Sequence, residues 1–217
     1  MNIKTDKSFK YNYEKLQPST EEFKFLKETF MTTAFRLSFD INADRLKIYK
    51  VNERNPVKTE VKPVKNLMLF HGTSQKGAIG ILKEGFRNSE KGWFGKGLYM
   101  TDCSYTAFNY ADMTGPGGHL TSHCIFVNEV LESESMQILE YDLEMKMGEE
   151  NVTHVNTVPD HTFEKHTLKT SLRTTEKDHM VDFEGRRYVK TRVENINDEY
   201  VADASVVIPR YLIVLEE

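Results

Sequence analysis

Apolar residues near the start of the chain recur at the spacing of a helix. Phe23, Leu26 and Phe30 are separated by three and four positions, so they fall on one helical face. Ser19 begins a Ser-Thr-Glu-Glu run in which a hydroxyl precedes a carboxylate by three positions, as at many helix starts. We therefore expect a helix from residue 19 to about residue 35 that covers a core with this face.

A second, shorter helix is expected at residues 76–84. The pattern turns Ala78, Ile79 and Leu82 inward, because they lie within one stripe of a helical surface. Gly85 follows the last position of this pattern. Glycine tolerates the left-handed backbone that commonly ends a helix, so we expect the helix to stop there.

A third helix is expected after an apolar strand at residues 98–101. Asp102 is placed to cap its first turn, and the helix then runs to about Met113. Gly-Pro-Gly-Gly at residues 115–118 ends it, since neither residue type favours a helix interior.

Strand patterns dominate the rest of the chain. Residues 67–70 are apolar on both faces, which is typical of a central strand. A weaker hairpin signal spans residues 180–193, where Glu184-Gly185 can form the turn. The other candidate strands are residues 45–51, 123–131, 136–139, 199–203 and 206–215. Many strands, few helices and no regular strand-helix-strand rhythm predict one α+β domain built around antiparallel sheet.

Composition narrows the class of protein. The 217 residues are 39% hydrophobic and 11% aromatic with a net charge of -4, which excludes a disordered chain and a protein that coats nucleic acid. No apolar run is long enough to span a membrane, and the first residues lack the hydrophobic core of a signal peptide. Two cysteines, Cys103 and Cys124, are too few for a disulfide framework and are expected to be buried thiols. We therefore expect an intracellular protein.

Candidate chemistry begins where the strand at residues 67–70 ends. His71-Gly72-Thr73 offers an imidazole, a hydroxyl and a backbone that a ligand can approach closely. Such a group suits a sugar or an amide. An ordinary strand end followed by a glycine turn has the same sequence, so the tripeptide alone leaves both interpretations open.

Two tyrosines bracket the turn between residues 98–101 and the third helix. Tyr99 and Tyr110 can hold a flat ring between their faces, and a cationic ring such as nicotinamide gains about 0.5–2 kcal/mol there. Each tyrosine could equally be a core residue. Glu199 heads a later strand, where a solvated carboxylate is the ordinary interpretation.

In this order and at these separations, the three groups resemble the catalytic domain of the poly(ADP-ribose) polymerase family, which carries a His-Tyr-Glu triad. The motifs are LFHGTSQKGAIGILKEGFR, FGKGLYMTDCSYTAFNYA and NDEYVADASVVIPRYLIVL. Weaker similarity extends outside them, so the resemblance covers roughly residues 20–215. The resemblance implies an ADP-ribosyltransferase fold of two packed, mainly antiparallel sheets with a few flanking helices. It places the catalytic domain at residues 19–217, after a lead-in at residues 1–18 that is either flexible or docked on the surface.

The resemblance implies that the chain uses NAD⁺ as a substrate and needs no metal. His71 would bind the adenosine-side ribose, and the Gly72 backbone would hold the nicotinamide carboxamide. Tyr99 and Tyr110 would flank the nicotinamide ring. The full set of binding residues that the resemblance implies is His71, Gly72, Thr73, Arg87, Tyr99 and Tyr110.

Glu199 stands where the family has its catalytic glutamate, in a triad with His71 and Tyr99. Release of nicotinamide leaves the ribose with oxocarbenium character, so a nearby carboxylate helps most in the transition state. The resemblance favours an NAD⁺-dependent ADP-ribosyltransferase that forms poly(ADP-ribose). Transfer of a single ADP-ribose is the main alternative, and a non-catalytic module that binds NAD⁺ or ADP-ribose is a third.

The sequence also departs from the family. Between the two tyrosines the polymerases usually carry Lys-Ser, whereas this chain has Thr106-Ala107, which removes a cation beside the glutamate and a hydroxyl for the carboxamide. No helical regulatory domain or targeting module is recognisable. The expected partner is an acceptor protein or the chain itself, while the charge does not support nucleic acid and nothing indicates a membrane. A metal site at His119, His123 and Cys124 is disfavoured, because no fourth ligand is evident.

Overall fold

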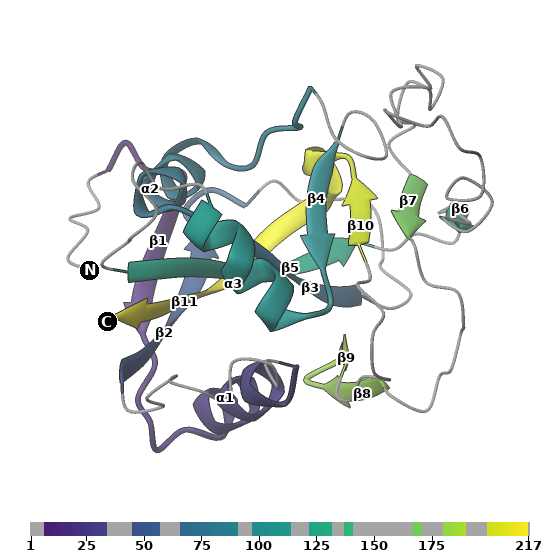
Figure 1. Cartoon of the computed structure of the whole chain (residues 1–217). Helices are drawn as coiled ribbons and strands as arrows, with labels where there is room; N and C mark the ends of the chain where they lie inside the picture. Colours follow the sequence, from purple (N-terminus) through teal and green to yellow (C-terminus); the bar gives the residue numbers. More distant parts are fainter. Residues whose placement is uncertain are drawn as a thin grey trace.

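The computed structural model describes residues 7–33, 45–56, 66–90, 97–113, 122–131, 137–140, 167–170, 180–189 and 199–216. The three helices in these ranges are α1 (Glu21–Thr33), α2 (Gln75–Glu84) and α3 (Ser104–Met113). The strands are β1 (Tyr11–Lys15), β2 (Leu46–Glu53), β3 (Asn66–Thr73), β4 (Leu98–Thr101), β5 (Ser122–Leu131), β6 (Gln137–Glu140), β7 (Thr167–Thr170), β8 (Met180–Phe183), β9 (Arg186–Val189), β10 (Glu199–Ala202) and β11 (Val207–Glu216). The expected α+β class is confirmed (Figure 1).

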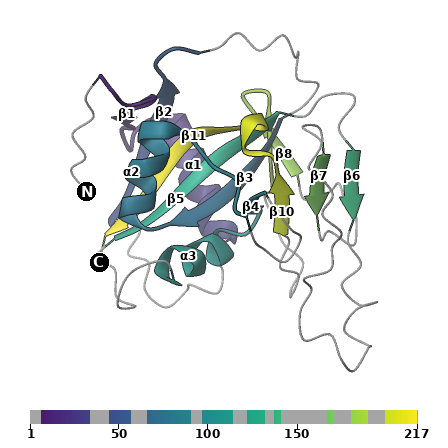
Figure 2. The same cartoon turned by 90° about the horizontal axis from the view of Figure 1, so that it is seen from above.

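The strands form two groups that meet at one pair of residues. Hydrogen bonding follows the order β1-β2-β11-β5-β3-β4-β10-β7-β6, and β9 joins β3 to β8. Only Phe70 and Thr101 are Cα partners between β3 and β4. We call β1-β2-β11-β5-β3 the first strand group and β4-β10-β7-β6 the second strand group; Figure 2 shows them on opposite sides of this junction. All pairs are antiparallel except β3 with β9 and β6 with β7.

The two strand groups pack against each other through a shared hydrophobic cluster. It combines residues of β3, β5 and β11 with residues of β4 and β10, all less than a tenth exposed: Leu67, Leu69, Val130, Val207, Leu98, Met100, Tyr200 and Ala202. Burial of this much apolar surface is the main force that can hold the groups together. The expected antiparallel pairing is confirmed, and the two strand groups stay hydrogen-bonded to each other as one continuous sheet through β3 and β4.

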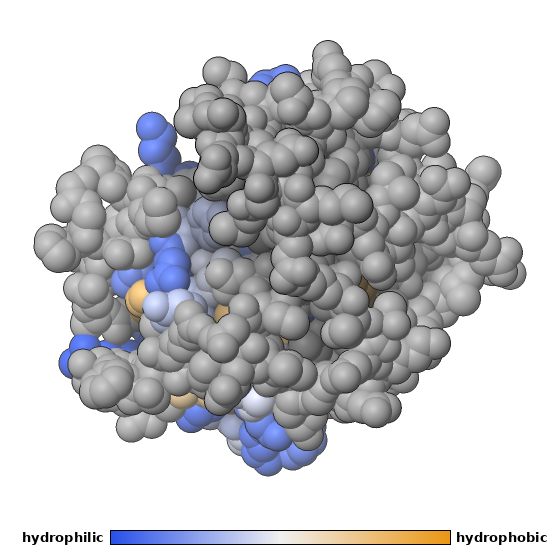
Figure 3. All heavy atoms as spheres, turned by 45° about the vertical axis from the view of Figure 1, so that its right-hand side comes forward, coloured by the Kyte–Doolittle hydropathy of each residue, from blue (hydrophilic) through white to orange (hydrophobic). Residues whose placement is uncertain are grey.

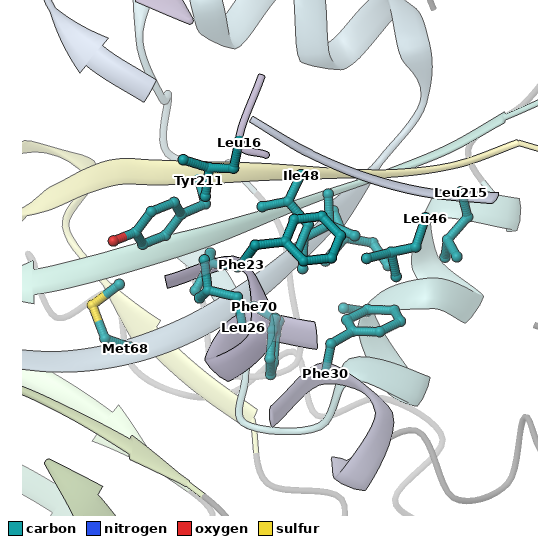
Figure 4. Close-up of a cluster of buried hydrophobic side chains, with 14 residues drawn as sticks. Leu16, Phe23, Leu26, Phe30, Leu46, Ile48, Met68, Phe70, Tyr211 and Leu215 are labelled. Atoms are coloured by element: carbon teal, nitrogen blue, oxygen red, sulfur yellow. The ribbon is translucent and has the colours of Figure 1, made fainter. Parts of the chain in front are cut away.

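Helices cover both faces of the first strand group. Tyr211 and Ile213 of β11 turn to the face covered by α1, where Phe23, Leu26 and Phe30 complete the cluster shown in Figure 4. The alternate residues Leu212 and Val214 turn to the opposite face, which α2 covers. This alternation explains why β11 is apolar at nearly every position.

α1 begins at Glu21, two residues after the start expected at residue 19. The hydroxyl of Thr20, rather than that of Ser19, accepts the backbone N–H of Phe23 at 3.2 Å. At the other end, the buried Ser104 hydroxyl donates to the carbonyl of Phe30 at 2.6 Å. A carbonyl in the last helical turn has no partner within the helix, so Ser104 satisfies it and ties α1 to α3.

α2 ends as predicted but presents a different face. Gly85 has φ of +92° and its N–H donates to the carbonyl of Ile81. The buried residues are Ala78, Ile81 and Leu82, whereas Ile79 is 36% exposed. The expectation for Ile79 was wrong because residues three and four apart share a face, and this face is centred on Ala78, Ile81 and Leu82.

The residue directly before α3 is Cys103, one position after the expected cap Asp102. α3 begins at Ser104, and the hydroxyl of Thr101 accepts the N–H of Cys103 at 3.1 Å. Asp102 is instead buried beside β10, where it accepts the Tyr200 hydroxyl at 3.5 Å. Its role depends on a strand about 100 residues away, which the local sequence does not reveal.

The predicted lead-in contributes an edge strand. β1 pairs antiparallel with β2 from Tyr11, opposite Glu53, to Lys15, opposite Tyr49. The ring of Tyr11 is buried in the hydrophobic cluster that α2 forms with Leu212 and Val214 of β11. This part of residues 1–18 is therefore docked on the domain.

Two further expectations are confirmed. Glu184 and Gly185 have φ of +48° and +75° and connect β8 to β9, as expected of a two-residue hairpin turn. Both cysteines are buried free thiols, and burial raises the pKa of the Cys124 thiol to about 12. The expected glycine stop at residues 115–118 and His119 lie outside the described residues.

Where described residues reach the surface in the view of Figure 3, blue hydrophilic residues are seen beside small orange hydrophobic areas. Ile79 and Tyr110 are the large hydrophobic residues found exposed among the described positions. Within the described ranges, no helix is both long and apolar enough to cross a membrane.

Candidate active site

Two neighbouring cavities open where β3 meets β4. The larger has a volume of about 490 Å³ and the smaller about 190 Å³. Volumes of about 300–1,000 Å³ are usual for small-molecule sites. The cavities share four lining residues, which are His71, Thr73, Tyr99 and Tyr110.

β3 turns successive residues of the His-Gly-Thr motif to opposite faces. His71 lines both cavities, whereas the open side of Gly72 faces α3. A Cβ at position 72 would lie 1.6 Å from the carbonyl oxygen of Ala107. Glycine is therefore required here by the close approach of a helix, while its backbone still lines the smaller cavity.

His71 is held in one tautomer. Its Nδ1 lies 2.8 Å from the carbonyl oxygen of Tyr99. Because a carbonyl can only accept, Nδ1 carries the proton, and Nε2 of the neutral ring is a hydrogen-bond acceptor. The ring also packs edge-on against Phe86, with centroids 5.3 Å apart, and this contact limits its rotation.

Burial keeps the imidazole neutral. The low-dielectric surroundings lower the pKa of His71, and the bond to the Tyr99 carbonyl opposes this shift only in part. A neutral ring can accept a hydrogen bond from a sugar hydroxyl, which an imidazolium cannot. The electrostatics therefore match the acceptor role that the tautomer requires.

Stability should fall as the pH is lowered through the range where His71 protonates. In the unfolded chain His71 protonates near its ordinary pKa of about 6.5, whereas in the folded chain its pKa is lower. The free energy of unfolding therefore decreases as the pH falls below about 6.5 and is unaffected by this group above that pH. We expect the difference in unfolding free energy between wild type and His71→Gln to shrink from pH 7.5 to pH 5. Urea unfolding at several pH values measures this, and a constant difference would contradict it.

Tyr99 and Tyr110 come together as the sequence predicted. β4 carries Tyr99 and α3 carries Tyr110, and both line both cavities. Tyr110 is 42% exposed, which is unusual for a large aromatic residue. A partly exposed ring in the wall of both cavities presents aromatic surface that a bound ligand can contact.

Thr73 and Arg87 both line the larger cavity, and Thr73 also lines the smaller one. The Thr73 hydroxyl rests against the first turn of α2, where a Cβ on Gly77 would come within 2.1 Å of it. Arg87 lines the same cavity, with its side chain 79% exposed and its guanidinium paired with Glu84. Arg87 must therefore exchange this surface ion pair if it is to meet a ligand.

Glu199 is placed by its backbone. β10 pairs with β4 so that Glu199 lies opposite Thr101 and Val201 lies opposite Tyr99. Thr101 lines the smaller cavity. Position 199 is thus next to the cavity wall, although its side chain lies outside the described part of the structure.

Sequence reasoning missed several wall residues. Phe86, Asn88 and Ser89 line the larger cavity, and Thr101 lines the smaller one. Phe86 and Asn88 immediately flank Arg87 in the sequence, which could have drawn attention to them. Thr101 carried no local signal, because its place depends on pairing with Phe70 and Glu199.

Comparison of the sequence with models of known protein families identifies the family of this chain. The family model for the poly(ADP-ribose) polymerase catalytic domain matches residues 13–217. The chain belongs to this family. No curated protein sequence matches it.

Membership in the poly(ADP-ribose) polymerase family gives the chain an ADP-ribosyltransferase fold. Domains of this family use NAD⁺ as their substrate. Among the described residues, no group of three or more His, Cys, Asp or Glu side chains could hold a metal ion. The match begins within β1, so the edge strand is part of the matched region.

Proposed function

We propose that the chain cleaves the bond between nicotinamide and ribose in NAD⁺ and transfers ADP-ribose to an acceptor, building poly(ADP-ribose). The observation that carries the proposal is the convergence of His71, Tyr99 and Tyr110 on two neighbouring cavities, beside the strand that begins at Glu199. NAD⁺ is a dinucleotide with two ends, and the two neighbouring cavities offer a place for each. Family membership supports the reaction type.

The nicotinamide end belongs in the smaller cavity. Its lining includes the Gly72 backbone, which can hold a carboxamide, and Tyr99 and Tyr110, whose faces favour a cationic ring. His71 lies between the two cavities and accepts a ribose hydroxyl through Nε2. Thr73 and Arg87 line the larger cavity, where they meet the adenosine end.

Glu199 supplies the catalytic charge in this proposal. Departure of neutral nicotinamide leaves positive charge on the ribose, and a fixed carboxylate stabilises that charge more in the transition state than in bound NAD⁺. The same carboxylate can orient the 2'-hydroxyl of an acceptor ADP-ribose. This second role is what chain elongation requires.

Transfer of a single ADP-ribose is the alternative, and α3 favours it. No lysine or arginine occurs between Tyr99 and Tyr110, and Thr106 and Ala107 are both buried. The Ala107 methyl packs in the core that α1 covers. No cation from this stretch is available to help orient the acceptor, so the polymer proposal gives that role to Glu199.

Labelled NAD⁺ separates the candidate functions. We expect wild-type protein to give a ladder or smear on a denaturing gel, which indicates polymer. One sharp shifted band would replace the polymer proposal with single transfer. Absence of any label, together with a melting temperature that NAD⁺ still raises, would show a binding module and overturn the catalytic proposal.

A further inference from the structure

The segment between α2 and β4 forms a wall of the larger cavity. Phe86, Arg87, Asn88 and Ser89 all line that cavity, and all follow the helix stop at Gly85. None of them is among the described residues that line the smaller cavity. We call residues 86–89 the outer wall.

The outer wall is tied to β4 through its backbone. Ser89 N–H donates to the Gly97 carbonyl at 2.8 Å, and Gly97 N–H donates to the Ser89 carbonyl at 3.0 Å. Gly97 directly precedes β4, which carries Tyr99. This bridge fixes the wall relative to one of the tyrosines.

A side chain ties the outer wall to the end of β10. Asn88 Nδ2 donates to Asp203 Oδ2 at 3.1 Å, and Asn88 Oδ1 accepts the Ala204 N–H at 2.8 Å. The other carboxylate oxygen of Asp203 accepts the Ser205 N–H at 2.8 Å. Asp203 immediately follows β10, the strand that begins at Glu199.

Both polar atoms of the Asn88 side-chain amide form hydrogen bonds within the protein. Its donor and its acceptor are each engaged by the turn that follows β10, so it is better suited to hold the wall than to bind a ligand. We infer that Asn88 is a positioning residue for ADP-ribosyl transfer. It couples the wall that receives the adenosine end of NAD⁺ to the strand that carries Glu199.

This inference rests on the proposed function. NAD⁺ bound across both cavities would be anchored at the outer wall while its ribose reacts beside β10. A displacement of about 1 Å between anchor and reacting group can cost about a hundredfold in rate. Loss of the Asn88 clamp should therefore lower the rate with NAD⁺ and leave binding of free nicotinamide unchanged, because the clamp lies outside the smaller cavity.

An exchange of the two side chains tests the clamp. Asn88→Asp alone places two carboxylates together and should lower kcat/KM for NAD⁺ by about tenfold or more. Asp203→Asn alone removes one hydrogen bond and should lower kcat/KM for NAD⁺ about threefold. The double variant keeps the net charge, and every bond remains possible with the donor reversed, so kcat/KM should return to within about twofold of wild type.

A control variant and nicotinamide binding separate positioning from general damage. Asn52→Ala, at an exposed position of β2, should leave kcat/KM and the melting temperature unchanged. Nicotinamide affinity should be equal in all variants. If each single variant retained wild-type kcat/KM, or if the exchange failed to restore it, the inference would be overturned while NAD⁺ turnover by wild type still upheld the proposed function. A wild type without turnover would overturn both.

Discussion

Glu199→Gln should lower the rate of nicotinamide release about a thousandfold while NAD⁺ binds almost as well as to wild type. A unit charge about 4 Å from the reacting ribose, at an effective dielectric constant of about 20, contributes ~4 kcal/mol. That free energy corresponds to about a thousandfold in rate. Glutamine keeps the size and hydrogen-bonding oxygen of the side chain but removes the charge, so the effect falls on the transition state.

Single-turnover release of nicotinamide measures the rate, and the rise in melting temperature with NAD⁺ reports binding. Glu21→Gln is a matched control, because the Glu21 side chain is 84% exposed on α1, away from the cavities. We expect this control to behave as wild type. Undiminished release by Glu199→Gln would refute the catalytic assignment, and equal loss of binding and rate would indicate a role in holding the substrate.

Gly72→Ala should destabilise the fold by about 3 kcal/mol or more. The added methyl would lie 1.6 Å from the carbonyl oxygen of Ala107 and 3.0 Å from the backbone nitrogen of Ala111. These are backbone atoms of α3, so the whole helix must move rather than one side chain. Overpacking typically costs about 1–3 kcal/mol even where neighbours can adjust, and here they cannot adjust locally.

Gly80→Ala provides the control for this substitution. Apart from the backbone of α2 itself, no atom of the described residues lies within 4 Å of a Cβ at position 80, which is inside α2. Alanine is favoured over glycine in a helix by up to about 1 kcal/mol, so this variant should be slightly more stable than wild type. Urea unfolding compares the two variants, and similar midpoints would contradict the packing argument. Because α3 also carries Tyr110, Gly72→Ala should weaken NAD⁺ binding as well.

Features set by a few neighbouring residues could be predicted from the sequence. Gly85 ends α2 because a positive φ suits glycine, and the Glu184-Gly185 turn follows the same rule. Strands β3 and β4 were predicted from runs of apolar residues, within a few residues of their bounds. In each case the physical cause lies within one element.

Features set by contacts between distant elements could not be predicted. Asp102 was expected to cap a helix, yet its place depends on Tyr200 of β10. The clamp between Asn88 and Asp203 joins residues 115 positions apart. Their local sequences do not distinguish them from ordinary loop residues.

The candidate site falls between these cases. Its residues could be recognised because the three motifs occur in the order that the family has. The structure brings His71, Tyr99 and Tyr110 to shared cavities. Gly72 was expected to admit a ligand to the backbone, whereas the structure shows that α3 also requires it. The role of Glu199 stays a prediction that its backbone register supports.

The junction at Phe70 and Thr101 limits how this site could be moved to another scaffold. Both residues line the smaller cavity, so one wall belongs to the first strand group and the facing wall to the second. A graft of the His-Gly-Thr motif alone, or of either group alone, would copy half of a pocket. A functional transplant would need both strand groups together with the outer wall, residues 86–89, which is hydrogen-bonded to Gly97, directly before β4, and to the turn after β10. This is close to the whole domain.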